Sequence, residues 1–313
     1  MIDQGDPVMA ALAEHRDVKV VPAPHQVVAT WPVGTFLENI VALDNDEFVV
    51  SVHNHRELHT VNAAGEHTLW ATMPVSPAGL IATGDAAFAV GGEPGQGPHR
   101  LIRVGIETRE VTDLGPIPGS LFLNGFTPGP PGTGYAVDSL VGGIFSVDLS
   151  TGDSHLVLQD PLLAKVSTEP MMPGANGIKR FRDGLYITNT DRALVVHATL
   201  DAAGVPTGTV EIVAEQLRGD DLAVAEDGVL YIANHIHNTV IRFSPRSGER
   251  VAIAGPDQGM AGSTACILGG TQAQATSLFV TTTGGIVMPL DGIVQEAKLV
   301  RIDIGGPNTG IRS

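Results

Sequence analysis

The sequence is poor in cysteine, and its single thiol excludes an internal disulfide. Cys266 lies in the apolar run 264–268, which predicts a buried strand thiol rather than a nucleophile. Residues 1–6 show no basic stretch followed by an apolar one, so no signal peptide is visible. We therefore expect a cytoplasmic protein, although a secreted chain trimmed of its signal peptide would have the same sequence.

Aromatic residues and positive charges are also scarce. Aromatic residues make up 4% of the chain, so the core must consist mainly of Val, Ile, Leu and Ala. The 18 Lys and Arg against 34 Asp and Glu give a formal net charge of −16, which repels nucleic acid and anionic membrane surfaces. No apolar run is long enough to span a membrane. The expected partner is a small-molecule substrate, and nothing in the sequence specifies an oligomeric state.

What the sequence does contain is a strand-rich unit that recurs along nearly its whole length. The segments 175–187 and 219–232 align, each with a polar residue, an apolar strand, an Asp-Gly pair and a second apolar strand. The pairs Asp183-Gly184 and Asp227-Gly228 are 44 residues apart and predict hairpin turns. Looser copies place the unit starts near residues 38, 78, 124, 176, 220 and 264. A period in the forties with short alternating strands predicts an all-β fold, a six-bladed β-propeller.

The two ends of the chain complement each other. The sixth unit stops before a fourth strand, whereas a spare strand at residues 26–30 precedes the first unit. We expect the N-terminal segment, about residues 20–32, to complete the last blade, so that pairing of the chain ends closes the ring. Residues 1–313 are therefore predicted to form a single propeller domain.

Carboxylate or amide side chains stand at four of the six unit starts. Inner strands of a propeller all begin at one face of the central channel, so these positions should face one another. The four are Glu38, Asn124, Asn176 and Asp220, and the other two are Ala78 and Thr264. Two carboxylates and two amides are hard oxygen ligands that suit Ca²⁺ better than Zn²⁺, with another divalent cation as the alternative. Asn and Asp also start strands by bonding the local backbone, which is the structural alternative.

These residues resemble the calcium-binding motifs of the gluconolactonase/regucalcin (senescence-marker-protein-like) family and, more distantly, those of paraoxonases. The resemblance implies a six-bladed propeller whose catalytic calcium is held by Glu38, Asn176 and Asp220. Asn124 matches an asparagine that is near the substrate in gluconolactonases and on calcium in paraoxonases, and Asp221 matches a second paraoxonase ligand. The arginine that gluconolactonases use for polar substrates has no clear counterpart. This argues against a sugar lactone as the substrate.

Histidines follow the second strand of two units. The segments 53–55 and 234–237 should line the pocket rim, so His53 and His235 are candidate general bases beside Asp220. The alternative is that each is an exposed loop histidine. Two long connections, residues 162–173 and 284–294, are rich in Leu, Ile, Val and Met. They could form an apolar wall for a hydrophobic substrate or pack down as ordinary loop cover.

Together these features predict a calcium-dependent hydrolase that opens a lactone or a related ester, and the apolar connections favour an apolar lactone. Asp220 or a rim histidine would activate water, and Asn124 would orient the carbonyl or the water. Two alternatives stay open. One is a non-hydrolytic biosynthetic enzyme on the same fold, strictosidine-synthase-like or a cyclase, and the other is a binding propeller without chemistry.

Overall fold

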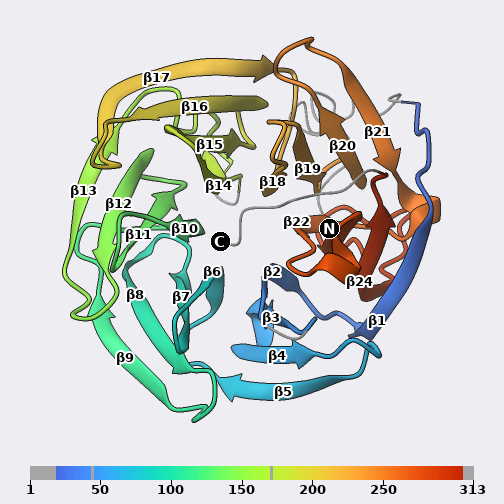
Figure 1. Ribbon diagram of the computed structural model, residues 1–313, viewed down its shortest axis with the longest axis horizontal. Helices are drawn as coiled ribbons and strands as arrows, with labels where there is room; N and C mark the ends of the chain where they lie inside the picture. The colour runs from blue at the N-terminus through green and yellow to red at the C-terminus, as the bar shows by residue number, and fades with distance from the viewer. Residues whose placement is uncertain (1–18, 44–45, 170–171, 306–313) are drawn as a thin grey trace.

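Short apolar strands joined by tight turns fold into six four-stranded antiparallel sheets around a central channel (Figure 1). This computed structural model describes residues 19–43, 46–169 and 172–305. Within them the predicted six-bladed propeller is confirmed. Two segments discussed above lie outside the described residues. They are residues 1–6, on which the expectation about a signal peptide rests, and residues 170–171 of the first long connection.

Each blade runs from an inner strand at the channel to an outer strand at the rim. Blade 1 contains β2 (Leu37–Ala42), β3 (Phe48–Val52), β4 (Glu57–Val61) and β5 (His67–Thr72). Blade 2 contains β6 (Pro77–Thr83), β7 (Ala86–Glu93), β8 (Gln96–Gly105) and β9 (Val111–Pro116). Blade 3 contains β10 (Leu123–Pro128), β11 (Thr133–Asp138), β12 (Gly143–Asp148) and β13 (Ser154–Gln159).

The second half of the ring repeats this order. Blade 4 contains β14 (Ala175–Phe181), β15 (Gly184–Asn189), β16 (Leu194–Leu200) and β17 (Pro206–Glu215). Blade 5 contains β18 (Leu222–Val224), β19 (Leu230–Asn234), β20 (Thr239–Phe243) and β21 (Arg250–Ala254). Blade 6 contains β22 (Ser263–Leu268), β23 (Ser277–Thr282), β24 (Glu296–Asp303) and β1 (His25–Val33). Within the described residues the chain also forms the short 3₁₀ helices η1 (His53–His55), η2 (Pro256–Gln258) and η3 (Gln272–Gln274).

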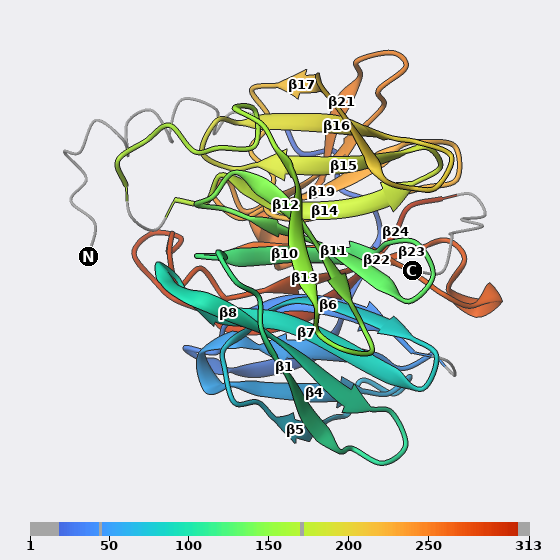
Figure 2. The same ribbon diagram turned by 90° about the vertical axis from the view of Figure 1, so that its left-hand side faces the viewer.

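The ring has two distinct faces. We call the face at which the six inner strands begin the upper face, and the face at which they end the lower face. The connections at 160–169, 172–174 and 284–295 project from the upper face, on the left of Figure 2. Residues that start the inner strands and residues that follow the second strands therefore meet at the upper end of the channel.

The ring is closed by the two ends of the chain, as the sequence predicted. Strand β1 pairs antiparallel with β24, from His25 opposite Ile302 to Val33 opposite Glu296 (Figure 1). Trp31 and Ala29 are buried there, against Leu299 and Ala297 of β24. The N-terminal strand thus covers an edge of blade 6 that would otherwise expose unpaired backbone groups.

A histidine clasp, formed by Trp31, His59 and His67, joins this closing strand to blade 1. The Trp31 Nε1 donates to His59 Nδ1 at 3.1 Å, and the Trp31 and His67 rings stack with centroids 4.2 Å apart. His67 Nε2 bonds the carbonyl oxygen of Thr30 at 3.0 Å, and His59 Nε2 bonds the Glu57 carboxylate at 3.0 Å. Since carbonyl and carboxylate oxygens only accept, both Nε2 atoms donate and both Nδ1 atoms are free of hydrogen in the neutral rings.

We expect this clasp to weaken in acid. Burial lowers the pKa of His67 from its usual 6.5, and the nearby His59 lowers it further, although the bond to Thr30 raises it. The contribution of neutral His67 to stability is therefore complete above pH 6.5 and is lost as the pH falls through the lower folded-state pKa. In denaturant melts, the difference in unfolding free energy between wild type and His67→Phe should shrink from pH 7.5 to about pH 5.5. A difference that is constant with pH would contradict the clasp.

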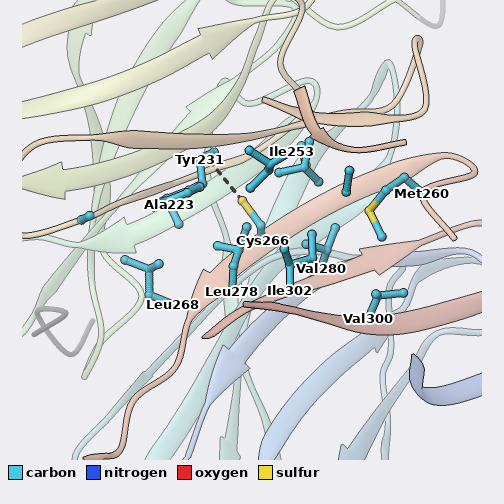
Figure 3. Close-up of a cluster of buried hydrophobic side chains, with 14 of the residues drawn as sticks. Ala223, Tyr231, Ile253, Met260, Cys266, Leu268, Leu278, Val280, Val300 and Ile302 are labelled. Atoms are coloured by element: carbon cyan, nitrogen blue, oxygen red, sulfur yellow. Dashed lines mark hydrogen bonds between the residues drawn. The ribbon is translucent and has the colours of Figure 1, made fainter. Parts of the chain in front are cut away.

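Hydrophobic cores lie between neighbouring blades, and Cys266 belongs to one of them. The cluster drawn in Figure 3 packs Ala223, Tyr231 and Ile253 of blade 5 against Cys266 and Leu278 of blade 6. The Cys266 thiol lies 3.2 Å from the carbonyl oxygen of Tyr231, and burial raises its pKa. The thiol is therefore a packed, protonated core group, as the sequence predicted.

One of the two predicted hairpin turns has a different conformation. Asp227-Gly228 behaves as expected, with Gly228 at a φ of 86°. In the β14–β15 hairpin, however, Gly184 already belongs to β15 and pairs with Phe181, and the positive φ of 53° falls on Arg182. Gly184 is needed for another reason, because a Cβ there would lie 1.7 Å from His197 Nε2.

Candidate active site

Each inner strand begins with a bulge at the upper face. In β2, Glu38 and Asn39 lie opposite the single residue Ser51 of β3, because Leu37 pairs with Val52 and Ile40 with Val50. The same two-against-one arrangement recurs in every blade, and it contains the six predicted start positions Glu38, Ala78, Asn124, Asn176, Asp220 and Thr264. A bulge turns side chains away from the regular alternation of a strand, which suits residues that must reach a channel.

Hydroxyl groups on the second strands satisfy the bulged backbone. Ser51 Oγ accepts the Asn39 amide at 2.9 Å, and Thr188 Oγ1 accepts the Gly177 amide at 2.8 Å. Thr281 Oγ1 does the same for Ala265 at 3.2 Å. The sequence analysis did not identify this feature. Its signal is a Ser or Thr at the last-but-one position of the second strand, as at Ser51, Thr188 and Thr281.

The glycine after each asparagine allows neighbouring blades to approach. A Cβ on Gly125 would lie 2.4 Å from the carbonyl oxygen of Asn176, and one on Gly177 would lie 2.4 Å from Asp221 Oδ1. Neither distance is possible for a real side chain, so Asn124 and Asn176 are each followed by the one residue that fits. The bulges therefore form a tight ring at this level of the channel.

Three carboxylates lie near one another in this ring. Burial raises the pKa of Glu38 well above its usual value, and the charges of Asp220 and Asp221 raise it further. Asp221 forms an ion pair with Lys179, whose Nζ lies 2.8 Å from Oδ2 and 3.1 Å from Oδ1, and burial raises the pKa of Asp221 in spite of it. The negative charge of the ring therefore exceeds the positive charge that the chain places there.

Asp220 and His235 form a hydrogen-bonded pair. His235 Nδ1 lies 3.0 Å from Asp220 Oδ2, and because a carboxylate accepts, Nδ1 is the donor. The other ring nitrogen, Nε2, is then an acceptor, and within the described part of the chain it is buried without a hydrogen-bond partner. His235 itself is only 7% exposed. A carboxylate that fixes one nitrogen and leaves the other free is the arrangement of a general base.

His53 lies close to this pair through Phe36. The Phe36 ring centroid is 5.7 Å from that of His53 and 5.9 Å from that of His235. His53 Nδ1 donates to the Pro77 carbonyl oxygen at 3.0 Å, and burial is the main cause of its lowered pKa. The structure thus brings both predicted rim histidines around one aromatic ring. Phe36 was not identified from the sequence, because its position depends on the turn between β1 and β2.

The two amides differ in their surroundings. Asn176 Nδ2 donates to Thr190 Oγ1 at 2.9 Å, which leaves its oxygen as the possible ligand. Asn124 is buried at 6% exposure in the equivalent bulge of β10. Arg218, two residues before Asp220, also reaches this rim and donates to the carbonyl oxygens of Thr190 and Asp191 at 2.8 and 3.0 Å. Burial lowers the pKa of Arg218.

The two other start positions are structural. Ala78 is buried at 2% exposure and carries no polar group. Thr264 Oγ1 donates to the Leu37 carbonyl oxygen at 2.7 Å and so joins blade 6 to blade 1. The polar side chains of the ring are therefore unevenly distributed around the channel.

Several rim residues also have structural roles. Asp138 accepts four backbone amides, those of Leu121, Phe122, Leu140 and Val141. Asn189 Nδ2 donates to the carbonyl oxygens of Leu162 and Ala164, and so anchors the first long connection. Rim polarity alone is thus no guide to chemistry.

The two long connections contribute apolar side chains beside His235. Met288 from the second connection packs with Ile236, and Met172 from the first connection lies against them. On the same connections, Val166 and Ile293 are more than 60% exposed. An apolar surface of this kind at the upper face fits an apolar ligand.

A hard divalent cation fits the donors of the ring better than a soft one. Among the described residues, no three His, Cys, Asp or Glu side chains come together in a group that could hold a metal ion. The four predicted ligands, Glu38, Asp220, Asn124 and Asn176, offer only carboxylate and amide oxygens, which a hard cation prefers. Burial is the main cause of the raised pKa of Glu38, and the charges of Asp220 and Asp221, which a cation would offset, raise it further.

The fold and this channel define a class, the six-bladed propellers with carboxylates and amides at the upper end of the channel. By sequence the chain matches no family profile and no curated protein. Its fold is similar to that of a luciferin-regenerating enzyme (12% identity, TM-score 0.69, 92% of this chain and 97% of that one). It is also similar to regucalcin from Agrobacterium tumefaciens, a calcium-binding protein (17%, 0.67, 94% and 99%), and to a provisionally assigned gluconolactonase (15%, 0.64, 93% and 95%).

At these identities the likeness shows a shared fold. It confirms the architectural resemblance to gluconolactonase and regucalcin structures that the sequence motifs predicted. No helix within the described residues has the length and apolarity that a membrane crossing requires.

Proposed function

We propose that the protein is a calcium-dependent hydrolase that opens a lactone or a related ester at the upper end of the channel. The observation that carries this proposal is the Asp220–His235 pair, whose buried Nε2 has no partner in the described residues, beside the carboxylate of Glu38. A free imidazole nitrogen beside an excess of carboxylates combines a base with a cation site, which are the two requirements of metal-assisted ester hydrolysis.

The side chains have separate tasks in this reaction. His235 Nε2 takes a proton from water, and the resulting hydroxide forms a bond to the carbonyl carbon. The same nitrogen then returns the proton to the leaving oxygen as the carbon–oxygen bond breaks. Asp220 holds Nδ1–H and so keeps the imidazole in the acceptor tautomer. Asn124 orients the carbonyl, and His53 is the second base within reach of the same pocket.

Glu38, Asn124, Asn176 and Asp220 are the residues that would hold the cation. When bound, Ca²⁺ supplies positive charge for the carbonyl oxygen as negative charge develops on it. The apolar side chains of Ile236, which follows His235 in the chain, and Met288 favour a substrate with an apolar body.

The test is calcium binding paired with activity. We expect Ca²⁺ at 1 mM to raise the melting temperature of the wild type, and chelator to remove both this shift and the hydrolysis of an apolar δ-lactone. Glu38→Gln should lose most of the shift. Glu211→Gln removes the same charge from an exposed position on β17 and should behave as wild type. If wild type and Glu38→Gln respond equally to calcium, the site is wrong.

The same assay separates the alternatives. A non-hydrolytic enzyme on this fold would convert an apolar substrate without chelator sensitivity and without opening a lactone. A binding propeller would show no turnover, and Asp220→Ala would leave its binding unchanged.

A further inference from the structure

A second cavity occupies the opposite, lower end of the channel. Its volume is about 610 Å³, and it is lined by the ends of all six inner strands together with the turns that follow them. Its lining residues start at the third or a later position of each long inner strand, beyond the bulges that carry Glu38 and Asn176. A cavity of this volume is in the range that small-molecule sites occupy, roughly 300–1,000 Å³.

The wall of this cavity is largely apolar. All six blades contribute an aliphatic or aromatic residue, namely Ile40, Leu80, Phe126, Phe181, Val224 and Leu268. Thr83, Gly84 and Arg182 at the lower mouth are exposed, so the cavity opens to solvent there. Burial of an apolar ligand body against these side chains is favourable.

All the charges on the cavity wall are positive and come from blade 4. Lys179, Arg180 and Arg182 line it, and no described lining residue is acidic. Lys179 is neutralised by Asp221, but the guanidinium groups donate only to backbone, Arg180 Nη1 to Gly129 O at 2.7 Å and Arg182 Nη2 to Glu226 O at 2.9 Å. Backbone carbonyls do not cancel a full charge. Besides Asp221, the carboxylate of Asp46 contacts the wall, where it accepts a hydrogen bond from Thr271 Oγ1.

This pattern is unusual for a chain of net charge −16. Among the described residues neither Arg180 nor Arg182 forms an ion pair, and Arg182 lies over the Phe181 ring instead. Both border an apolar cavity in a protein with nearly twice as many acidic as basic residues. We propose that the lower cavity binds a small amphipathic carboxylate, with its apolar body on the channel wall and its anionic group at Arg180 and Arg182. This site is separate from the proposed hydrolytic site and does not depend on it.

Isothermal titration with three probes tests the proposal. The probes share one apolar body, a phenylbutyl group, and differ in the charge of the group at its end. They are 4-phenylbutyrate, 4-phenyl-1-butanol and 4-phenylbutylammonium. We expect the carboxylate to bind at least tenfold more tightly than the alcohol, and the ammonium ion to bind most weakly. Arg180→Gln/Arg182→Gln should lower carboxylate affinity about tenfold and leave the alcohol unchanged. Arg246→Gln removes an exposed arginine outside the cavity and is the matched control.

The outcomes are distinct from those of the hydrolase test. Binding of the carboxylate should persist in Glu38→Gln and in the presence of chelator, and lactone hydrolysis should persist in the double arginine variant. Equal affinities for the carboxylate and the alcohol would overturn the proposal. The proposal would also be overturned if the double arginine variant bound the carboxylate as tightly as the wild type does, provided that its melting curve shows it to be folded.

Discussion

Replacing His235 by glutamine is expected to lower kcat for ester or lactone hydrolysis by about 10²–10⁴, the usual contribution of a general base. Glutamine has a similar reach and can still donate to Asp220, but it has no ring nitrogen that takes up a proton. The loss should therefore appear in kcat, with KM changing little. Calcium should still raise the melting temperature of the variant, because the proposed ligands are intact.

Two further variants make this result specific. His55 is an exposed histidine on the same upper rim, and His55→Gln should retain wild-type kcat. His53→Gln tests the second candidate base. Because His53 Nδ1 donates to the Pro77 carbonyl oxygen, Nε2 of the neutral ring carries no proton and could accept one. If His53→Gln loses the activity and His235→Gln keeps it, the base is His53 and the Asp220–His235 pair is structural.

The ring of blades was predictable because the sequence repeats one strand unit from blade to blade. The spacing of Asp183 and Asp227, and the spare strand ahead of the first unit, follow from local strand and turn preferences that act alike in every blade. The fine structure of the hairpins was less accessible. At Gly184 a side chain from the neighbouring strand, His197, decides the need for glycine, and no local pattern reveals such a contact.

The sequence predicted those residues of the candidate site that stand at equivalent positions of the repeated units. Glu38 and Asp220 stand at equivalent positions of their units, so the ring geometry brings them together. Phe36 and Lys179 could not be found this way, because each acts across blades. Phe36 reaches His235 of blade 5 from the closing turn, and Lys179 of blade 4 reaches Asp221 of blade 5. Their roles depend on side-chain directions that have no counterpart in the other units.

Lys179 connects the two ends of the channel. Its side chain lines the lower cavity, while its Nζ bonds both oxygens of Asp221, whose charge in turn acts on Glu38 at the upper face. The ammonium group therefore offsets one of the three carboxylates of the ring. Neutralising it should affect stability first and cation binding second.

We expect Lys179→Met to destabilise the protein by about 3–5 kcal/mol, because it leaves the Asp221 carboxylate buried without a partner. The methionine side chain retains the apolar stem of lysine, so the loss reports the charge rather than packing. Calcium should recover part of this loss, since the ring then holds more uncompensated negative charge. Equilibrium denaturation with and without calcium measures both effects.

A double variant shows whether the unpaired charge of Asp221 causes the loss of stability in Lys179→Met. In Lys179→Met/Asp221→Asn both charges are gone, so the unfolding free energy should recover to within about 1–2 kcal/mol of the wild type. Asp221→Asn alone should cost less than Lys179→Met alone, because the lysine side chain is 20% exposed and the aspartate side chain only 6%. If the two single losses simply add in the double variant, the ion pair contributes nothing and the stability of the ring comes from its bulges and hydroxyl bonds. In that case another group already balances the charge of Asp221. The upper site then carries less uncompensated negative charge than the raised pKa of Glu38 indicates.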